Sequence, residues 1–298
     1  MVWRPTLPTK DSARLDVRKT YKLYVGGAFP RSESGRTYLV NDAKGALMAN
    51  ASQASRKDAR DAVVAARKAF GGWSGKTAYN RGQVLYRIAE VMEGRHEQFS
   101  AEVASSEGLS ISKARAVVDA SIDRWVWYAG WADKIGQLLG ATNPVAGPYF
   151  NFTIPEPTGV VGIVAPGDRS LLGLVSRLAP AIVSGNTAVL LASERSPLPA
   201  VSLGEVLATS DVPGGVVNIL TGLTEELVPW LAGHMDVNAI DVTGVPPDAR
   251  AEAERLSAEN VKRVVRARDV DPFSEEAQSP YEVTALMEYK TVWHPMGA

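Results

Sequence analysis

The chain has 298 residues, with 32 Lys and Arg against 33 Asp and Glu, and it contains three histidines and no cysteine. The lack of cysteine excludes a disulfide framework, a thiolate metal site, an iron–sulfur cluster and a cysteine nucleophile. The formal net charge of −1 gives no electrostatic reason to expect nucleic acid or an anionic membrane as a partner. Three scattered histidines, His96, His234 and His294, disfavour a histidine-rich metal site. The length suits one large or two medium domains with a proper core.

The N-terminal residues, Met1–Pro5, lack the uninterrupted apolar stretch of a signal peptide. No apolar run of the sequence reaches the length that a bilayer-spanning helix needs. We therefore expect a cytoplasmic protein with no membrane partner.

Residues 1–139 are predicted to begin with short extended pieces and to continue as helices. Lys22–Val25, followed by two glycines, predicts a strand and a tight turn. Ser55 and Asp58 have the spacing of a capping box, which begins a helix that Gly71 and Gly72 are expected to end. The apolar spacing predicts two further helices, over about Tyr79–Ser106 and Ser112–Leu139.

The last of these helices carries four large aromatic residues: Trp125, Trp127, Tyr128 and Trp131. They could form an aromatic box for a ligand. We favour a packed helix face instead, because large aromatics at this spacing usually fill cores or subunit contacts.

Residues 140–157 differ in character from the helices before them. Tyr149–Ile154 is β-prone and bounded by Pro and Gly, which predicts one arm of a hairpin rather than part of the core.

The most regular part of the chain follows, with strand-like runs alternating with helical ones. The predicted strands are Gly159–Ala165, Thr187–Ala192, Val216–Thr221, Val237–Thr243 and Lys262–Arg266. The predicted helices are Leu171–Val183, Ala200–Thr209, Glu225–Ala232 and Asp248–Glu259. Nearly continuous Val, Ile and Leu strands that alternate with helices predict an α/β fold with a doubly wound parallel sheet.

The alternation ends after Asp269. Residues 271–280 have the composition of a polar linker. Lys290–Trp293 predicts a last strand in the tail.

A doubly wound sheet binds its ligands at the carboxyl ends of its strands. The G-x-G-x-x-G signature of dinucleotide binding is absent here, because Gly159 and Gly162 precede or interrupt the first strand instead of following it. No G-x-x-x-x-G-K-[ST] motif is present either. The fold class alone is therefore a weak argument for a cofactor.

Several colinear segments resemble the NAD(P)-dependent aldehyde dehydrogenase superfamily. The segments that match its cofactor domain are Glu156–Pro166, Leu178–Thr187, Ser193–Pro197, Val212–Gly222 and His234–Gly244. Tyr24–Gly27 and Tyr128–Ile135 fit the same family upstream. Together they cover residues from about 20 to 265 in one order, far more than a single motif match supplies.

The resemblance implies a division of the chain into three parts. Residues 1–139 and 158–270 correspond to the Rossmann-like cofactor domain. Residues 140–157 and 281–298 correspond to the oligomerisation hairpin and the C-terminal tail strand of the family. The linker 271–280 then stands in place of the catalytic domain, so the chain resembles a truncated member without that domain.

The family's catalytic positions are altered here. Where the family has the Asn that donates a hydrogen bond to the oxyanion, this chain has Asp168, which has no donor when ionised and would repel an oxyanion. Ala267 stands at the position of the general base. We therefore predict no catalytic residues. Asp168 and Arg169 could be a new acid–base pair, but we favour a salt bridge within a loop.

The resemblance leaves only weak, residual cofactor positions: Pro166, Glu194 and Gly244. The family's ribose clamp becomes Leu191–Glu194, in which only the Glu is kept. Pro246 and Pro247 remove two N–H donors where the family's helix would hold a pyrophosphate. We therefore expect no cofactor, with NAD or NADP binding weakened at best. A basic cluster at Lys262, Arg263, Arg266 and Arg268 is interpreted as a solvated face rather than a phosphate site.

The parts that correspond to the family's oligomerisation element are kept. In the family the tail strand pairs with the hairpin, and an exposed β-edge without a partner would be an aggregation hazard. We therefore expect a full-length aldehyde dehydrogenase subunit, or a second copy of this chain, to bind through Tyr149, Phe150, Phe152, Val292 and Trp293.

Three functions are compatible with this pattern. The first, which we favour, is a catalytically inactive family member that assembles with a full-length aldehyde dehydrogenase as a structural or regulatory subunit. The second is an NAD(P)-binding module without chemistry. The third is an oxidoreductase that acts on aldehydes through a partner's active site. Covalent acyl-enzyme chemistry needs an activated nucleophile, and no cysteine supplies it.

Overall fold

The computed structural model describes residues 18–266 and 268–297. Its centre is a five-stranded parallel sheet in the order β10-β9-β6-β7-β8. The strands are β6 (Val160–Val164), β7 (Thr187–Leu191), β8 (Val217–Leu220), β9 (Ala239–Asp241) and β10 (Arg263–Val265). Every residue of β6 and β7 is buried, as expected for parallel strands covered on both faces. The predicted doubly wound α/β fold is confirmed.

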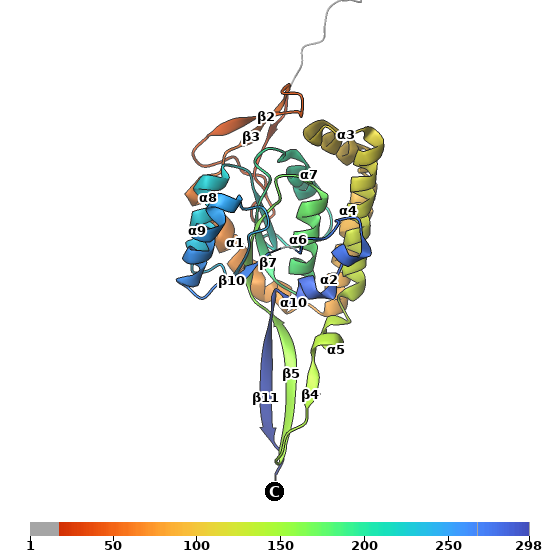
Figure 1. Cartoon of the computed structure of the whole chain (residues 1–298), viewed down its shortest axis with the longest axis vertical. Coiled ribbons are helices and arrows are strands. Elements are labelled where there is room, and N and C mark those ends of the chain that lie inside the picture. The colour runs from red at the N-terminus through yellow and green to blue at the C-terminus, as the bar shows by residue number, and fades with distance from the viewer. Residues whose placement is uncertain (1–17, 267, 298) are drawn as a thin grey trace, which may run out of the picture.

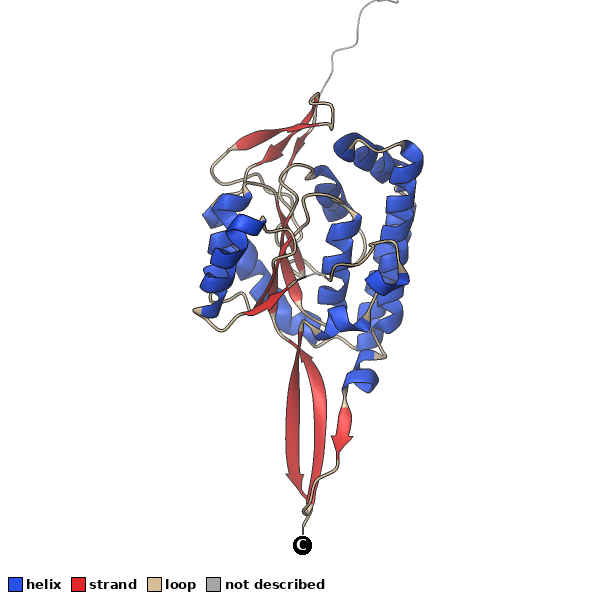
Figure 2. Ribbon diagram, viewed as in Figure 1, coloured by secondary structure: helices blue, strands red, loops and turns tan. Residues whose placement is uncertain are grey.

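Helices cover both faces of this sheet (Figure 2). One face carries α1 (Arg56–Ser74), α8 (Thr224–Gly233) and α9 (Pro247–Ala258); the other carries α6 (Leu172–Val183) and α7 (Leu198–Leu207). Alternate strand residues enter the two cores: Val161 and Ile163 face α6, whereas Val160 and Val164 face the α1 side. Two separate hydrophobic layers therefore hold one sheet between them.

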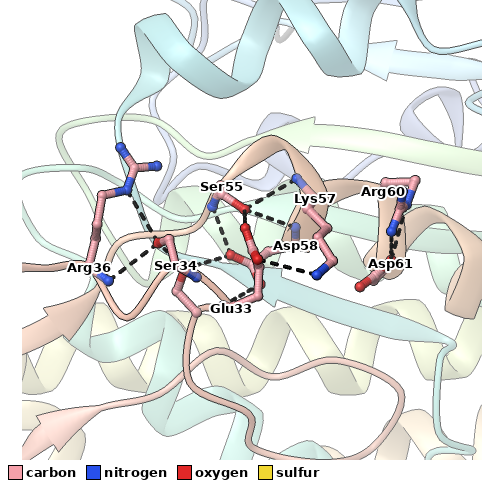
Figure 3. A network of polar contacts seen from close by, with 9 residues as sticks. Glu33, Ser34, Arg36, Ser55, Lys57, Asp58, Arg60 and Asp61 are labelled. Atoms are coloured by element: carbon pink, nitrogen blue, oxygen red, sulfur yellow. Dashed lines mark hydrogen bonds and ion pairs between the residues drawn. The ribbon is translucent and has the colours of Figure 1, made fainter.

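The capping box predicted at the start of α1 is present and is extended by neighbouring loops (Figure 3). The Ser55 hydroxyl accepts hydrogen bonds from the N–H groups of Lys57 and Asp58. The Asp58 carboxylate accepts one from the Ser55 N–H at 2.8 Å and another from the Ser32 hydroxyl at 2.7 Å. The loop that precedes the second strand of the chain is thereby tied to the first turn of α1.

The predicted end of α1 is wrong, because the helix continues through Gly71 and Gly72 to Ser74 and is capped by Gly75. Trp73, directly after the two glycines, is 1% exposed, and its indole N–H donates to the Ile182 carbonyl at 2.9 Å. This tertiary anchor holds the last turn helical despite the low helix propensity of glycine.

Each of the next two predicted helices is divided into two separate helices in the structure. Residues 78–107 form α2 (Ala78–Glu93) and α3 (His96–Glu107), and residues 111–139 form α4 (Ile111–Trp131) and α5 (Ile135–Leu139). On α4, Trp125 and Tyr128 are fully buried in the core. Trp127 packs against the edge of that core. The packed-face interpretation is confirmed for these three aromatics, whereas Trp131 is half-buried with its ring 5.5 Å from that of Trp127.

The N-terminal region is more regular than predicted. β1 (Thr20–Tyr21), β2 (Thr37–Asn41) and β3 (Leu47–Ser52) form a small sheet in the order β1-β3-β2. Lys22–Val25 is not a strand, because Tyr24 and Val25 form only isolated bridges, with Ile219 of β8 and with Ala28. The predicted tight turn is present, with Gly26 and Gly27 both at positive φ.

A third sheet, which we name the projecting sheet, extends away from the rest of the molecule (Figure 1). It contains β11 (Met287–Pro295), β5 (Tyr149–Pro157) and β4 (Ala141–Asn143), in the order β11-β5-β4. β11 pairs antiparallel with β5 over nine residue pairs, from Met287 with Pro157 to Pro295 with Tyr149. The pairing of the tail strand with the hairpin is therefore confirmed. A 3-10 turn (Glu275–Ala277) and α10 (Pro280–Thr284) lie between β10 and β11.

Candidate functional site

The three weak cofactor positions lie at one edge of the central sheet. Pro166 follows β6, Glu194 follows β7 and Gly244 follows β9, and these three strands are neighbours in the sheet. The chain leaves β6 toward β7 on one side, and β9 lies on the other side. This edge is therefore the topological switch point, where doubly wound sheets bind ligands.

Gly244 brings the turn after β9 against the end of β6. Its N–H donates to the Val164 carbonyl at 3.0 Å. A Cβ at this position would collide with the backbone carbonyl of Ala165. Only glycine allows so close an approach of the two backbones, so the role of Gly244 seen here is packing.

Asp168 lies in the loop after β6 and is exposed. The predicted ion pair with Arg169 is absent from the described residues, and Arg169 itself has a positive φ of 63°. An ion pair between exposed side chains in a loop contributes little free energy to folding, so little would hold Asp168 and Arg169 together. Asp168 places no hydrogen-bond donor at this edge when it is ionised, as the sequence predicts.

The carboxylate of Glu194 is already used within the chain. Its Oε2 accepts a hydrogen bond from the N–H of Thr224, the first residue of α8, at 2.9 Å. This bond satisfies one of the N–H groups that a helix leaves unpaired at its start. Leu191, at the end of β7, is fully buried. Leu191 has no polar side-chain atom, and one of the two carboxylate oxygens of Glu194 is engaged by α8.

The helix starts at this edge are acidic and poor in donors. α9 begins at Pro247, directly after Pro246, and neither proline has an N–H. The Ala249 N–H is engaged by the Pro246 carbonyl and the Asp248 carboxylate. The first turn of α8 carries Glu225 and Glu226. Carboxylates at a helix N-terminus oppose a phosphate there.

The contact between α8 and α9 is filled by side chains. Val228 and Leu231 of α8 belong to the same buried cluster as Ala253 of α9 and Val245 before it. The prolines at the start of α9 and the carboxylates at the start of α8 therefore disfavour a phosphate group at these two helix starts. No group of three or more potential metal ligands occurs among residues 18–266 and 268–297.

Ala267, at the family's general-base position, lies outside the described residues. Arg266 and Arg268 are exposed, as in the predicted solvated face. Lys262 is buried and Arg263 is half-buried, so that interpretation is wrong for these two residues. Lys262 is 7% exposed, and its ammonium donates to the carbonyls of His234 and Val237. Burial lowers its pKa to about 8. Arg263 donates to the carbonyls of Ala285 and Met287.

A buried charge network beneath this edge was not predicted. The Arg177 guanidinium, on α6, donates to the Asp241 carboxylate at 2.5 Å and to the Glu282 carboxylate at 2.6 Å. All three side chains are less than 10% exposed. Despite its own burial, Glu282 has its pKa lowered by Arg177 and Arg268. The available signal was Arg177 itself, the single charged residue of an otherwise apolar helix.

A cavity of about 310 Å³ lies beside the network. It is lined by Pro166, Asp168 and Thr243 at the strand ends and by Arg124 of α4 and Arg268 after β10. The positive charge of Arg268 is paired with Glu282 at 2.9 Å. Of the charged residues that line the cavity, Arg177 and Arg268 are therefore paired with carboxylates.

The projecting sheet brings together the five residues predicted to bind a partner, on its two faces. In the β5–β11 register Phe152 lies opposite Val292 on the same face as Phe150, with the two Phe rings 5.4 Å apart. Tyr149 and Trp293 share the other face, with ring centroids 5.7 Å apart. Phe150 is 46% exposed and Trp293 58%.

Comparison with known proteins assigns the family. The sequence profile of the aldehyde dehydrogenase family matches residues 29–267. The chain belongs to this family. Mouse cytosolic 10-formyltetrahydrofolate dehydrogenase is 35% identical over 263 residues, which cover 86% of this chain and 29% of that protein. Chicken retinal dehydrogenase 2 is 34% identical over 255 residues, covering 84% and 48%.

Solved structures agree with this assignment. HpcC from Thermus thermophilus superposes with a TM-score of 0.80 at 30% identity, covering 84% of this chain and 48% of that one. The NAD+ complex of an aldehyde dehydrogenase from Bacillus cereus superposes with a TM-score of 0.78 at 27% identity, covering 84% and 51%. The chain thus spans about half or less of the length of these relatives. In the described part of the chain, no helix is long and apolar enough to cross a membrane.

Proposed function

We propose that this chain is a catalytically inactive aldehyde dehydrogenase family member that assembles with a full-length aldehyde dehydrogenase as a structural or regulatory subunit. The observation that carries the proposal is the projecting sheet, which is fully paired over nine residues of β5 and β11 and exposes aromatic side chains on both faces. Exposed apolar patches of this kind mark surfaces that contact other proteins.

The lack of catalysis is supported by the residues at the family's reactive positions. The sequence contains no cysteine, and Asp168 replaces the family's oxyanion donor. Removing one such donor typically costs about 2.7–4 kcal/mol of transition-state stabilisation, and an ionised carboxylate adds repulsion. The methyl side chain of Ala267 accepts no proton. A panel of aldehydes with NAD+ and NADP+ should give no turnover above background with the purified chain.

The same proposal includes loss of cofactor binding. It is supported by the capping role of Glu194, by Pro246 and Pro247 at the start of α9 and by the filled contact between α8 and α9. The relative from Bacillus cereus binds NAD+, so retained binding is the main alternative. Calorimetric titration should show no heat with either dinucleotide at millimolar concentration. A saturable signal would favour an NAD(P)-binding module or action through a partner's active site.

The assembly is tested by co-expression with a full-length aldehyde dehydrogenase from the same organism, followed by native mass measurement. We expect a mixed species. It should be lost when Phe150→Ser and Val292→Ser are combined. Tyr79→Ser, which removes an aromatic ring that is 68% exposed on α2, is the matched control and should leave the mixed species intact. Elution of the unmodified chain alone and as a monomer would overturn the proposal.

The compartment follows from the same proposal. A subunit of a full-length aldehyde dehydrogenase must share its compartment, and the mouse relative is described as cytosolic. We therefore propose a cytoplasmic location, which microscopy of the tagged chain can test.

A further inference from the structure

The segment between β10 and β11 crosses the face of the molecule that carries the 310 Å³ cavity. We name residues 268–286 the closing segment. Figure 1 shows this blue segment passing over α6 and reaching α4 before it enters β11. The composition of residues 271–280 predicts a polar linker, yet side chains of α4, α6 and the β6–β7 region hold the closing segment along its length.

Arg124 holds the first half of the closing segment. This α4 side chain is 3% exposed, and its guanidinium donates to the Pro272 carbonyl at 2.8 Å and the Ala277 carbonyl at 3.1 Å. A third bond, at 2.6 Å, goes to the Ser176 hydroxyl of α6. No carboxylate forms an ion pair with Arg124 within the described ranges. Two backbone carbonyl groups of the closing segment therefore accept hydrogen bonds from this buried cation in place of water.

Arg177 holds the second half. Its guanidinium joins Glu282 of α10 to Asp241 at the end of β9, so the closing segment is tied by charge to the central sheet. Arg268 binds the other carboxylate oxygen of Glu282. Because all the charges of this network are paired while largely buried, release of Glu282 would leave Arg177 and Asp241 to be resolvated.

Apolar burial completes the attachment. Val283, Leu286 and Met287 are at most 3% exposed and belong to the main hydrophobic core. The side-chain amide of Asn186, in the turn before β7, donates to the Leu286 carbonyl at 2.9 Å and also accepts from the Gly159 N–H. The end of the closing segment is thus part of the core.

We propose that the closing segment is a fixed intramolecular cover of this face, with Arg124 and Arg177 as its positioning residues. A partner subunit then contacts the chain through the projecting sheet and not through the covered face. The second statement rests on the proposed function, and the first does not. Atoms of the closing segment contact Arg124 and the Arg177 network. Without this segment, both would be exposed to a partner.

The cover is tested by amide hydrogen exchange on the full chain. In the unmodified protein, amides of residues 271–279 should exchange at least about tenfold more slowly than in an unstructured peptide of the same sequence. Arg124→Met keeps the length of the side chain but removes its donors, and it should raise exchange of these amides by about tenfold. Arg124→Lys should give an intermediate increase, because one ammonium cannot reach two carbonyls in the same planar geometry.

Arg115→Met is the matched control, because Arg115 is an exposed residue of α4 that pairs with Glu97. It should leave exchange of residues 271–279 unchanged. Exchange as fast as in the unstructured peptide, or equal effects of the Arg115 and Arg124 variants, would overturn the proposal that the closing segment is a fixed cover.

The contact surface is tested in the co-expressed complex by the same method. Added protection should fall on β5 and β11, with none on residues 268–286. Added protection of the closing segment would overturn the second statement. Absence of any complex would overturn the proposed function, whereas the exchange rates of the free chain would still decide whether the cover exists.

Discussion

The Glu194 carboxylate accepts a hydrogen bond from the N–H of Thr224 at 2.9 Å, which links the end of β7 to the start of α8. The sequence resemblance predicts Glu194 as the one residue kept from the family's ribose clamp, and in this structure its carboxylate bonds to the start of α8. The relationship shows how a side chain that matches a family motif can be retained for local stability.

Glu194→Ala should therefore destabilise the protein by about 1 kcal/mol, the typical effect of losing a helix cap. Chemical denaturation followed by circular dichroism measures this change. Arg195→Ala is the control, because the side chain of Arg195 has no polar partner in the part of the chain that the structure describes, and it should change the unfolding free energy by less than about 0.5 kcal/mol. Equal effects of the two variants would contradict a capping role.

Arg177→Met should destabilise the protein strongly, by about 3–5 kcal/mol, because Asp241 and Glu282 would remain buried without their counter-ion. Urea denaturation measures the loss. Arg255→Met removes an arginine that also pairs with two carboxylates, Glu252 and Glu259, but on the exposed surface of α9, and it should leave stability nearly unchanged. A small effect of the Arg177 variant would show that the buried network is dispensable.

Gly244→Ala and Gly71→Ala should have opposite effects on stability. The new methyl group at residue 244 meets the backbone of Ala165, which should cost about 1–3 kcal/mol or more. Gly71 lies in the exposed part of α1 with open space around its Cα, so alanine there should stabilise by about 0.5–1 kcal/mol. Melting temperatures of the two variants measured under the same conditions check both signs. A stabilising Gly244 variant would contradict the close approach of the two turns.

The burial of Lys262 predicts a pH dependence. Its pKa falls from 10.5 when the chain is unfolded to about 8 in the fold, so between these values the unfolded chain binds more protons. Stability should therefore increase with pH from about 8 to 10.5 relative to Lys262→Met, which lacks the titrating group. Denaturation curves of both proteins at several pH values test this. A constant difference between them would contradict a lowered pKa.

The sequence predicted most of the α/β region because its signals are local and repeated. The buried strands of the central sheet read as continuous apolar runs, and each is followed by a helix with an apolar face. The end of α1 could not be predicted, because Gly71 and Gly72 are ordinary helix terminators until Trp73 is anchored to Ile182. The split of the predicted helix 79–106 into α2 and α3 had a local signal that the prediction did not use, because Gly94 caps the end of α2.

The chemistry of the residues at the candidate site follows from the sequence, but their contacts do not. Asp168 and the prolines at the start of α9 are properties of the sequence, and their chemistry follows from residue type alone. The use of Glu194 by α8 and the pairing of Lys262 with two carbonyls depend on segments that are 30 and 25 to 28 residues apart.

By itself, therefore, the sequence determined the fold class, the membership of a family and the absence of a cysteine side chain. These properties depend on residue identity and on short-range apolar periodicity, both of which are visible along the chain. Only the tertiary structure decided that residues 268–286 cover the face beside α4 and α6, and that the predicted contact residues divide between two faces of the projecting sheet. Composition marks such a segment as polar, but its attachment depends on where Arg124 and Arg177 are placed by distant helices.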